Sequence, residues 1–136
     1  MSLLFADTFY FIALLDSADP HHARAVAWSR LRDTLYVTTE FVLVELADAF
    51  HSPGRRQEFV VFQDALRSDA RWRILPAHRR LYAAGLDLYR RRDKRWQLTD
   101  CISFAVMHRL RVNDALTGDR HFIQAGFKAL LAQTTG

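Results

Sequence analysis

Short apolar runs alternate with longer helical segments along this chain, and that alternation constrains the fold more than any other feature. Buried parallel strands read as short, continuous apolar runs. The runs that we expect to form strands are 3–6, 35–38, 73–75, 115–117 and, at a sheet edge, 127–131. The pattern predicts an α/β fold: a three-layer sandwich with a short, mostly parallel central sheet that helices cover on both faces.

The segments between these runs have the length and periodicity of helices. We expect helices at about 20–31, 40–50, 55–67, 77–92 and 100–110. Thr39 and Thr99 are the expected N-cap residues of two of them, and Asp19-Pro20 is the expected start of another. The sequence contains no repeat, linker or low-complexity segment. We therefore expect residues 1–136 to form a single domain with a core of normal size.

The composition argues against several classes of protein. Half of the residues are hydrophobic and a quarter are charged, which is typical of a globular domain rather than a disordered or fibrous one. No apolar stretch approaches the roughly 18 residues of a membrane span, and the first residues do not resemble a secretory signal. The single cysteine, Cys101, excludes an intramolecular disulfide. We expect a cytoplasmic protein with no membrane partner.

Four carboxylates recur at the junctions between these segments. Asp7 follows the first expected strand, Asp119 follows the strand at 115–117, and Asp100 lies in the first turn of a helix. In parallel sheets, sites form beyond the carboxyl ends of the strands, so these three side chains can converge. Glu45 has no cationic side chain three or four positions away on its helix, and nothing local neutralises it.

A cluster of four carboxylates requires compensation. Two carboxylates about 4 Å apart repel each other by about 4 kcal/mol at an effective dielectric constant near 20, so the cluster persists only with protons or a cation. Ligation by oxygen alone favours Mg²⁺ or Mn²⁺. The net charge is +4, and with these acids set aside, 19 Lys and Arg face only 11 of the 15 Asp and Glu. A basic exterior around an acidic pocket suits a polyanion that binds at a metal site.

Each acid also has an ordinary structural explanation. Glu45 could edge a solvated helix face, and Asp100 could do no more than start a helix. Asp119 could be a turn residue, and Asp7 could cap a short helix that begins near Phe9. Only their joint placement favours a functional site.

Four stretches of the chain carry these acids in a specific context. They are FADTFYFIALLD, TTEFVLVELADAF, DKRWQLTDCISFAVMHRL and DALTGDRHFIQAGF. In this order they resemble the four conserved blocks of the PIN-domain ribonucleases, most closely the VapC-type toxins of bacterial toxin–antitoxin pairs. The metal-binding acids of the family correspond here to Asp7, Glu45, Asp100 and Asp119.

The resemblance implies a function as well as a fold. It implies an endoribonuclease that hydrolyses RNA phosphodiester bonds with Mg²⁺ or Mn²⁺, together with a cognate antitoxin protein and a homodimer. Thr8 and Thr117 match hydroxyl positions beside the site, where they would hold metal-bound water. All four acids are present, so the site shows no sign of degeneration.

Contacts with RNA are less sharply marked by the sequence. The densest basic cluster lies at 90–95 and includes Lys94 and Arg95, and Trp96 beside it is a candidate stacking platform for an unpaired base. The arginines could instead complement a helix dipole, and Trp96 could belong to the core. Arg120 and His121 are further candidates because they adjoin Asp119, although His121 could equally be a structural histidine.

Other classes of protein remain as alternatives. A non-catalytic or housekeeping interaction module with the same fold is one of them. A phosphoacceptor signalling domain is another, but it would need paired acids after the first strand and a lysine after the last. Phe5-Ala6-Asp7-Thr8 carries one acid, and Lys128 lies inside the last apolar run. Cys101 and His108 could suggest a nucleophile and a base, yet core packing explains them better.

Overall fold

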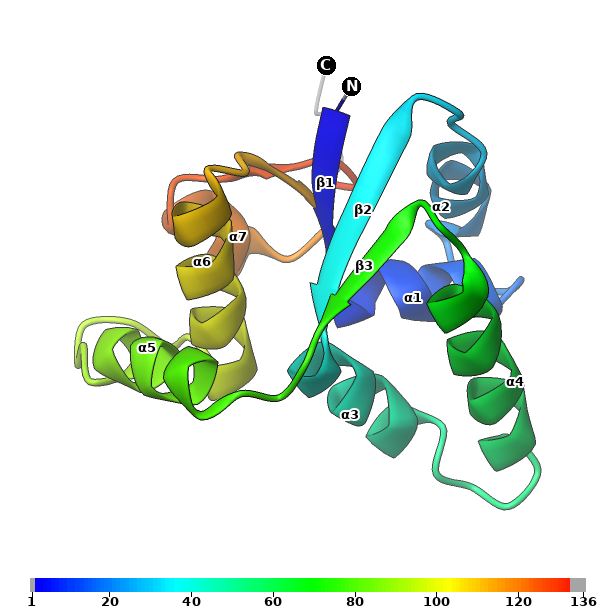
Figure 1. The fold of residues 1–136 in the computed structure, drawn as a ribbon, viewed down its shortest axis with the longest axis horizontal. Coiled ribbons are helices and arrows are strands. Elements are labelled where there is room, and N and C mark those ends of the chain that lie inside the picture. The colour runs from blue at the N-terminus through cyan, green and yellow to red at the C-terminus, as the bar shows by residue number, and fades with distance from the viewer. Residues whose placement is uncertain (1, 133–136) are drawn as a thin grey trace.

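The computed structural model describes residues 2–132, in which five strands form one sheet flanked by seven helices (Figure 1). The strands are β1 (Ser2–Ala6), β2 (Thr34–Thr39), β3 (Trp72–Leu75), β4 (Asp114–Leu116) and β5 (Lys128–Ala129). Their order across the sheet is β3-β2-β1-β4-β5, and every neighbouring pair is parallel. The predicted α/β architecture is confirmed, with a sheet that is wholly rather than mostly parallel.

Two groups of helices lie on opposite sides of the sheet, as the right and left of Figure 1 show. The helices are α1 (Thr8–Leu15), α2 (His22–Ser29), α3 (Glu40–Ala49), α4 (Arg56–Ser68), α5 (Arg79–Tyr89), α6 (Leu98–Leu110) and α7 (Arg120–Gln124). Helices α1, α2 and α4 form one group, α5, α6 and α7 form the other, and α3 lies beyond the carboxyl ends of the strands. Among residues 2–132, no helix combines the length and apolar character that crossing a membrane requires.

The register of β1 and β4 positions the residues that follow them. Ala6 pairs with Leu116, which is the last residue of β4. The backbone N–H of Asp7 donates to the carbonyl of Leu116 at 3.3 Å. Both strands end at this level, so Asp7 and Thr117 leave the sheet side by side.

Aromatic side chains fill the core on both sides of the sheet. On the side of α1, the rings of Tyr36 and Trp72 stack with centroids 4.6 Å apart, and Phe11 lies 5.5 Å from Trp72. On the side of α6, Phe104 packs edge-on against Phe122 at 4.9 Å. Buried rings of this size contribute much of the apolar burial in a small domain. They fix the helices that carry the site.

The two predicted helix caps have different outcomes. Thr39 caps α3 as predicted, because its hydroxyl accepts a hydrogen bond from the N–H of Val42 at 3.2 Å. Helix α6 is capped by Gln97 rather than by Thr99. Gln97 and Asp100 form a reciprocal capping box that satisfies two backbone N–H groups, and this places the helix start earlier than predicted.

Three further elements differ from the prediction. Helix α2 begins at His22 rather than at Pro20, because the side chain of Asp19 accepts a hydrogen bond from the backbone N–H of His21 in a turn before the helix. Strand β5 covers only Lys128–Ala129 instead of 127–131, since β4 pairs with it at just two positions. Helix α7 was not predicted, because its single turn is too short to show a helical period.

Helix α5 packs closely against α6 at Gly85. A Cβ atom at this position would lie 2.8 Å from the backbone N and Cα of Ile102 in α6. Ordinary side chains do not tolerate contacts of this length with backbone, so α5 and α6 approach each other only because residue 85 is glycine.

We expect Gly85→Ala to lower the free energy of unfolding by about 1 to 3 kcal/mol, because the added methyl group overpacks the α5–α6 contact. Gly54→Ala is the matched control, since no atom lies within 4 Å of a Cβ built there. Urea denaturation followed by circular dichroism measures both variants. Equal stability of the two would contradict the close approach of the helices.

Candidate metal centre

Asp7 lies at the carboxyl end of β1 and at the N-cap position of α1. Its side chain makes no capping hydrogen bond to that helix and instead accepts from the hydroxyl of Thr117 at 2.8 Å. The residue is only 5% exposed. Burial raises the pKa of Asp7 to about 7, the charges of Asp100 and Glu45 add to the rise, and the hydrogen bond from Thr117 opposes it. Asp7 therefore does not serve as the simple helix cap that the sequence allowed.

Asp100 performs two tasks at the start of α6. Its Oδ2 accepts from the backbone N–H of Gln97 at 3.2 Å, which completes the capping box. The same oxygen lies 3.0 Å from Nδ1 of His121. Burial raises the pKa of Asp100, and the nearby charge of Asp119 raises it further. The structural explanation of Asp100 is correct, and it does not prevent the side chain from facing the cluster.

Asp119 is the N-cap of α7 and lies close to both Asp100 and His121. Its Oδ1 accepts from the backbone N–H of His121 at 2.9 Å and lies 3.7 Å from Nδ1 of that ring. One potential ligand atom from each of these three residues lies within 4.8 Å of the others. The imidazole that the sequence suggested as an RNA contact therefore stands between two of the predicted metal-binding acids.

Glu45 reaches the cluster from α3. Its carboxylate accepts a hydrogen bond from the hydroxyl of Thr8, the first residue of α1, and its charge contributes to the raised pKa of Asp7. The other acids near the same helix face have different surroundings. Glu40 pairs with Arg67 at 2.7 Å, and Asp48 is exposed. Glu45 is half-buried, and it is the acid of α3 whose charge raises the pKa of Asp7.

The two predicted hydroxyls hold carboxylates. Thr8 bonds Glu45, and Thr117 both donates to Asp7 and accepts from the N–H of Asp119 at 3.1 Å. The neighbouring Gly118 lies against the outer edge of the ring of Phe9, where a Cβ would lie 2.5 Å from the nearest ring carbon. This contact presses the 117–119 turn against α1. The hydroxyls thus orient the acids, and the predicted contact with metal-bound water remains a prediction.

The donor set fits a divalent metal ion. Within the part of the chain that the structure describes, no Lys or Arg forms an ion pair with any of the four acids. Carboxylate oxygens predominate, and such oxygens suit Mg²⁺ and Mn²⁺. His121 adds one nitrogen that Mn²⁺ accepts more readily than Mg²⁺. The sequence identified His121 as a neighbour of Asp119, but it carried no signal that the same ring would also lie 3.0 Å from Asp100.

The remaining candidates for RNA contact lie beside this cluster. Arg95 and Arg120 are exposed, and Lys94 is half-buried. Trp96 is 7% exposed, and its Nε1–H donates to Oε1 of Gln124 at 3.2 Å. The stacking platform predicted at Trp96 is therefore wrong in this structure, because the ring is part of the core and offers no open face to a base.

Cys101 and His108 do not form a catalytic pair. Burial raises the pKa of the Cys101 thiol, which disfavours the reactive thiolate. His108 is exposed, and its ring packs against Phe127 with centroids 4.9 Å apart. The packing explanation holds for the cysteine, and the histidine covers the edge of an aromatic cluster.

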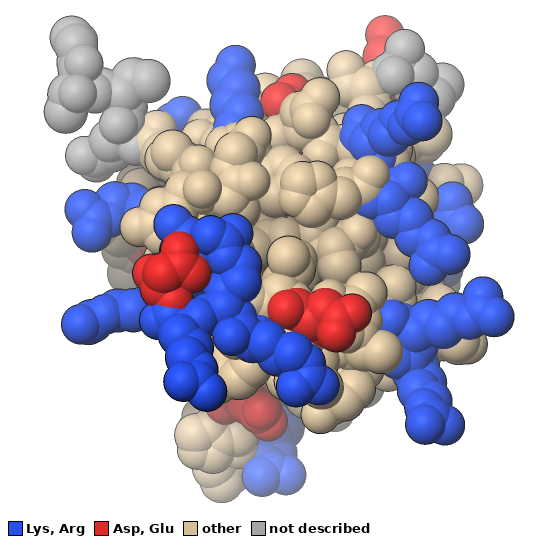
Figure 2. Space-filling model, turned by 90° about the vertical axis from the view of Figure 1, so that its left-hand side faces the viewer, with Lys and Arg blue, Asp and Glu red and all other residues tan. Residues whose placement is uncertain are grey.

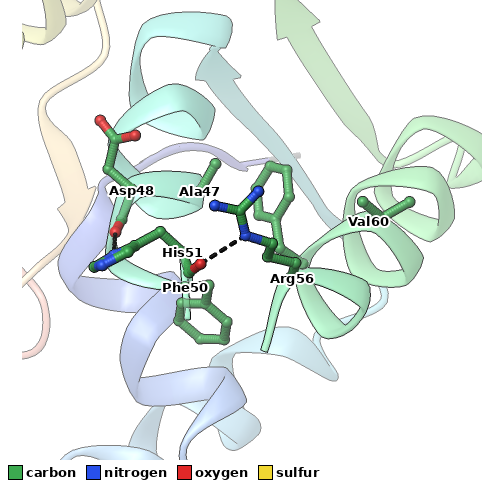
Figure 3. A pocket seen from close by; sticks show the side chains of 7 residues that line it. Ala47, Asp48, Phe50, His51, Arg56 and Val60 are labelled. Atoms are coloured by element: carbon green, nitrogen blue, oxygen red, sulfur yellow. Dashed lines mark hydrogen bonds between the residues drawn. The ribbon is translucent and has the colours of Figure 1, made fainter. Parts of the chain in front are cut away.

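A separate cavity of about 310 Å³ lies between α3 and α4 (Figure 3). Nδ1 of His51 bonds the carbonyl of Asp48, and Nε of Arg56 donates to the carbonyl of His51. These polar side chains are hydrogen-bonded to backbone carbonyl groups around the α3–α4 turn. None of the four acids lines this cavity, so it is not part of the candidate metal centre.

Comparisons with known proteins identify similar sequences and folds. A family model for the PIN domain matches residues 4–128. The crystal structure of VapC20 from Mycobacterium tuberculosis, a toxin that cleaves the sarcin–ricin loop, is 25% identical with a TM-score of 0.79, and the match covers 91% of this chain and 95% of that one. A search of curated proteins found no match.

Two further solved structures share the fold at lower identity. VapBC2 from Rickettsia felis, bound to a DNA fragment from its promoter, is 10% identical with a TM-score of 0.66, and the match covers 95% of this chain and 97% of that one. FitAcB from Neisseria gonorrhoeae is 20% identical with a TM-score of 0.61 and 95% coverage of both chains. Each supports the architecture of the sheet and its helices.

The raised pKa of Asp7 predicts a pH-dependent stability in metal-free buffer. An acid with a higher pKa in the folded chain binds its proton more tightly there, so its ionisation destabilises the fold as the pH rises. Relative to Asp7→Asn, we expect the wild-type free energy of unfolding to fall by about 2 to 3 kcal/mol between about pH 5 and about pH 8.

Urea denaturation in the presence of a chelator measures this difference. Asp48→Asn is the control, because Asp48 is exposed on the same helix as Glu45 and should give no such trend. Saturating Mg²⁺ or Mn²⁺ should recover the lost stability of the wild type near pH 8, because a ligand that binds only the folded state stabilises it. A constant gap between wild type and Asp7→Asn across the pH range would refute the burial of an uncompensated charge.

Proposed function

Because the chain belongs to the PIN domain family, we propose that it is a metal-dependent endoribonuclease, a hydrolase that cuts RNA phosphodiester bonds and acts as the toxin of a toxin–antitoxin pair. The observation that supports this proposal is a set of acids from separate segments. Asp100 and Asp119 share a cluster with His121, Thr117 links Asp7 to Asp119, and the charges of Asp100 and Glu45 raise the pKa of Asp7. Their charges have no Lys or Arg partner in residues 2–132. Structural ion pairs do not explain such a cluster, whereas a cation does.

Asp7, Glu45, Asp100 and Asp119 are the residues that would hold Mg²⁺ or Mn²⁺. When bound, such an ion lowers the pKa of the attacking water and offsets negative charge at the scissile phosphate. The protein keeps its own acids in place: Thr117 holds Asp7, and the capping box holds Asp100 at the end of a rigid helix. Preorganisation of this kind avoids reorganisation during the reaction.

The residues around the centre suit a polyanionic substrate. Arg120 is exposed next to Asp119 and can approach a phosphate on the strand that enters the site. The basic exterior attracts RNA from a distance, and the acids concentrate negative charge at one point only. VapC20 acts on the sarcin–ricin loop, so a structured ribosomal RNA loop is the first substrate class to test for this chain.

The same relatives support the proposed partners. VapBC2 and FitAcB are structural neighbours, and we propose that this chain likewise binds an antitoxin protein. A basic side chain of that partner would neutralise the acidic cluster without a metal ion. We also propose that the protein works in the cytoplasm, where RNA is available, and that it forms a homodimer.

We expect Asp100→Asn and Asp7→Asn each to reduce RNA cleavage by at least about a hundredfold, because each removes a ligand charge with little change in shape. Asp48→Asn should cleave like the wild type, since its side chain lies outside the cluster. End-labelled structured RNAs, including a sarcin–ricin loop, are incubated with Mg²⁺, Mn²⁺ or chelator. Full activity of both site variants, with normal circular dichroism, would refute the four-acid site.

Thr117→Val should weaken Mn²⁺ binding and cleavage by roughly 10- to 100-fold, because it frees the carboxylate of Asp7 and one N–H of the 117–119 turn. Thr117→Ser keeps the hydroxyl and should restore most of both properties. Isothermal titration with Mn²⁺ reports binding apart from catalysis. If valine and serine give the same affinity, the hydroxyl does not position Asp7.

A further inference from the structure

A polar cavity of about 180 Å³ is lined by residues of α6, of the end of α7 and of the loop after α5, and none of the four acids lines it. Two cations from the loop after α5, Arg91 and Lys94, form part of its wall, and Gln124 at the end of α7 forms another part. Figure 2 shows the molecule from the side that carries α5, α6 and α7, and Lys and Arg side chains gather there. The cavity therefore combines positive charge with hydrogen-bonding groups.

The ring of Trp96 makes cation–π contacts with both cations. The guanidinium carbon of Arg91 lies 5.3 Å from the centre of the ring, and Nζ of Lys94 lies 5.7 Å from it. The ring packs edge-on against Phe104 at 5.1 Å, and its N–H is bonded to Gln124. Cation–π contacts of this length hold charged groups over a fixed surface. The loop is thus anchored to α6 and α7 rather than free in solvent.

The charge in the cavity is only partly compensated. Asp93 is the acid that pairs with both cations, at 3.0 Å from Nη2 of Arg91 and 3.9 Å from Nζ of Lys94. Its side chain is 61% exposed. Exposed pairs of this kind contribute little energy, so an incoming anion can displace the carboxylate. One acid shared by two cations leaves a net positive charge facing the cavity.

The position of the cavity relates it to the acidic cluster. Phe104 lines the cavity and lies one helical turn after Asp100, a rise of about 6 Å along α6. On α7, Gln124 lies one turn after His121. The two helices therefore carry Asp100 and Asp119 at their N-terminal ends. On α6 the cavity begins one turn further along and extends over two turns, a rise of about 6 to 12 Å, which one or two nucleotides of a strand can span.

We propose that this cavity binds a phosphate group of the RNA strand next to the one that is cut, with Arg91 and Lys94 as its ligands. The inference rests on the proposed function, because it takes RNA as the substrate. Arg91 supplies a planar fork for phosphate oxygens, and Lys94 supplies a point charge. Trp96 supports the two cations and does not stack on a base.

The double variant Arg91→Gln with Lys94→Gln tests the cavity. Fluorescence anisotropy measures the affinity of a labelled short single-stranded RNA over a range of salt concentrations, in chelator so that no cleavage occurs. We expect the affinity to fall roughly tenfold. The negative slope of the logarithm of the association constant against the logarithm of salt concentration should become shallower by about 0.7, because one phosphate contact on a single strand is lost.

Two controls make the result specific. Arg30→Gln with Arg32→Gln removes two exposed charges that precede β2, at the opposite end of the sheet, and should leave both quantities near the wild-type values. Arg91→Lys with Lys94→Arg keeps both charges and should recover most of the affinity. Wild-type affinity and slope in the double Gln variant, or an equal loss in the Arg30/Arg32 control, would overturn the proposal.

The measurement does not depend on cleavage. A protein that binds RNA through this cavity but cuts none would contradict the proposed nuclease and leave the phosphate site standing. A protein that cuts RNA while the double Gln variant binds it like the wild type would leave the nuclease standing and remove the phosphate site.

Discussion

Uncompensated negative charge at the carboxyl edge of the sheet is the constraint on which the rest of this structure depends. Asp7 is almost fully buried beside Asp100 and Glu45, and burial together with their charges raises its pKa to about 7. A buried carboxylate without a partner is costly, and it is retained only where protons or a cation compensate it. The pairing of β1 with β4 creates this situation, because it brings Asp7 beside Thr117 and the turn that carries Asp119. The fold therefore gives up stability at the point where we propose that it binds a positive ion.

Two acids of the site also stabilise the ends of helices. This second role is why an ordinary structural explanation of each acid was plausible from the sequence. Asp100 closes a capping box and Asp119 caps α7, so each satisfies backbone N–H groups as well as facing the cluster. Asp7 behaves differently, because it occupies an N-cap position and leaves the helix without a side-chain cap. An N-cap aspartate that forgoes this bond loses roughly 1 kcal/mol of helix stability, which is consistent with a side chain committed elsewhere.

The fold and the placement of the four acids were predictable because they depend on short-range signals and on one topological rule. Apolar runs indicated the strands, and the rule that sites form at the carboxyl ends of parallel strands joined Asp7 with Asp119. The predictions that failed depend on contacts between distant segments. Trp96 is buried because Phe104 of α6 and Gln124 of α7 contact it, and no local pattern encodes that arrangement. Helix α7 is a single turn, so its period could not be read, and the contact of His121 with Asp100 depends on that turn.

The acidic and the cationic side chains lie in separate regions, and a polyanionic substrate explains this separation. A cluster of carboxylates repels RNA, and a purely basic surface would bind RNA without directing any bond to a metal ion. Here Asp100 and Asp119 lie at the starts of α6 and α7, Asp7 lies just after β1 and Glu45 lies in α3. The cations lie on a loop that Trp96 connects to α6 and α7. The Debye length of about 10 Å in 0.1 M salt exceeds the rise of one helical turn, so the fields of the acids and of the cations overlap between the two regions. We infer that the cations hold the RNA strand at close range, and that a divalent ion offsets part of the negative charge of the acids when the strand reaches them.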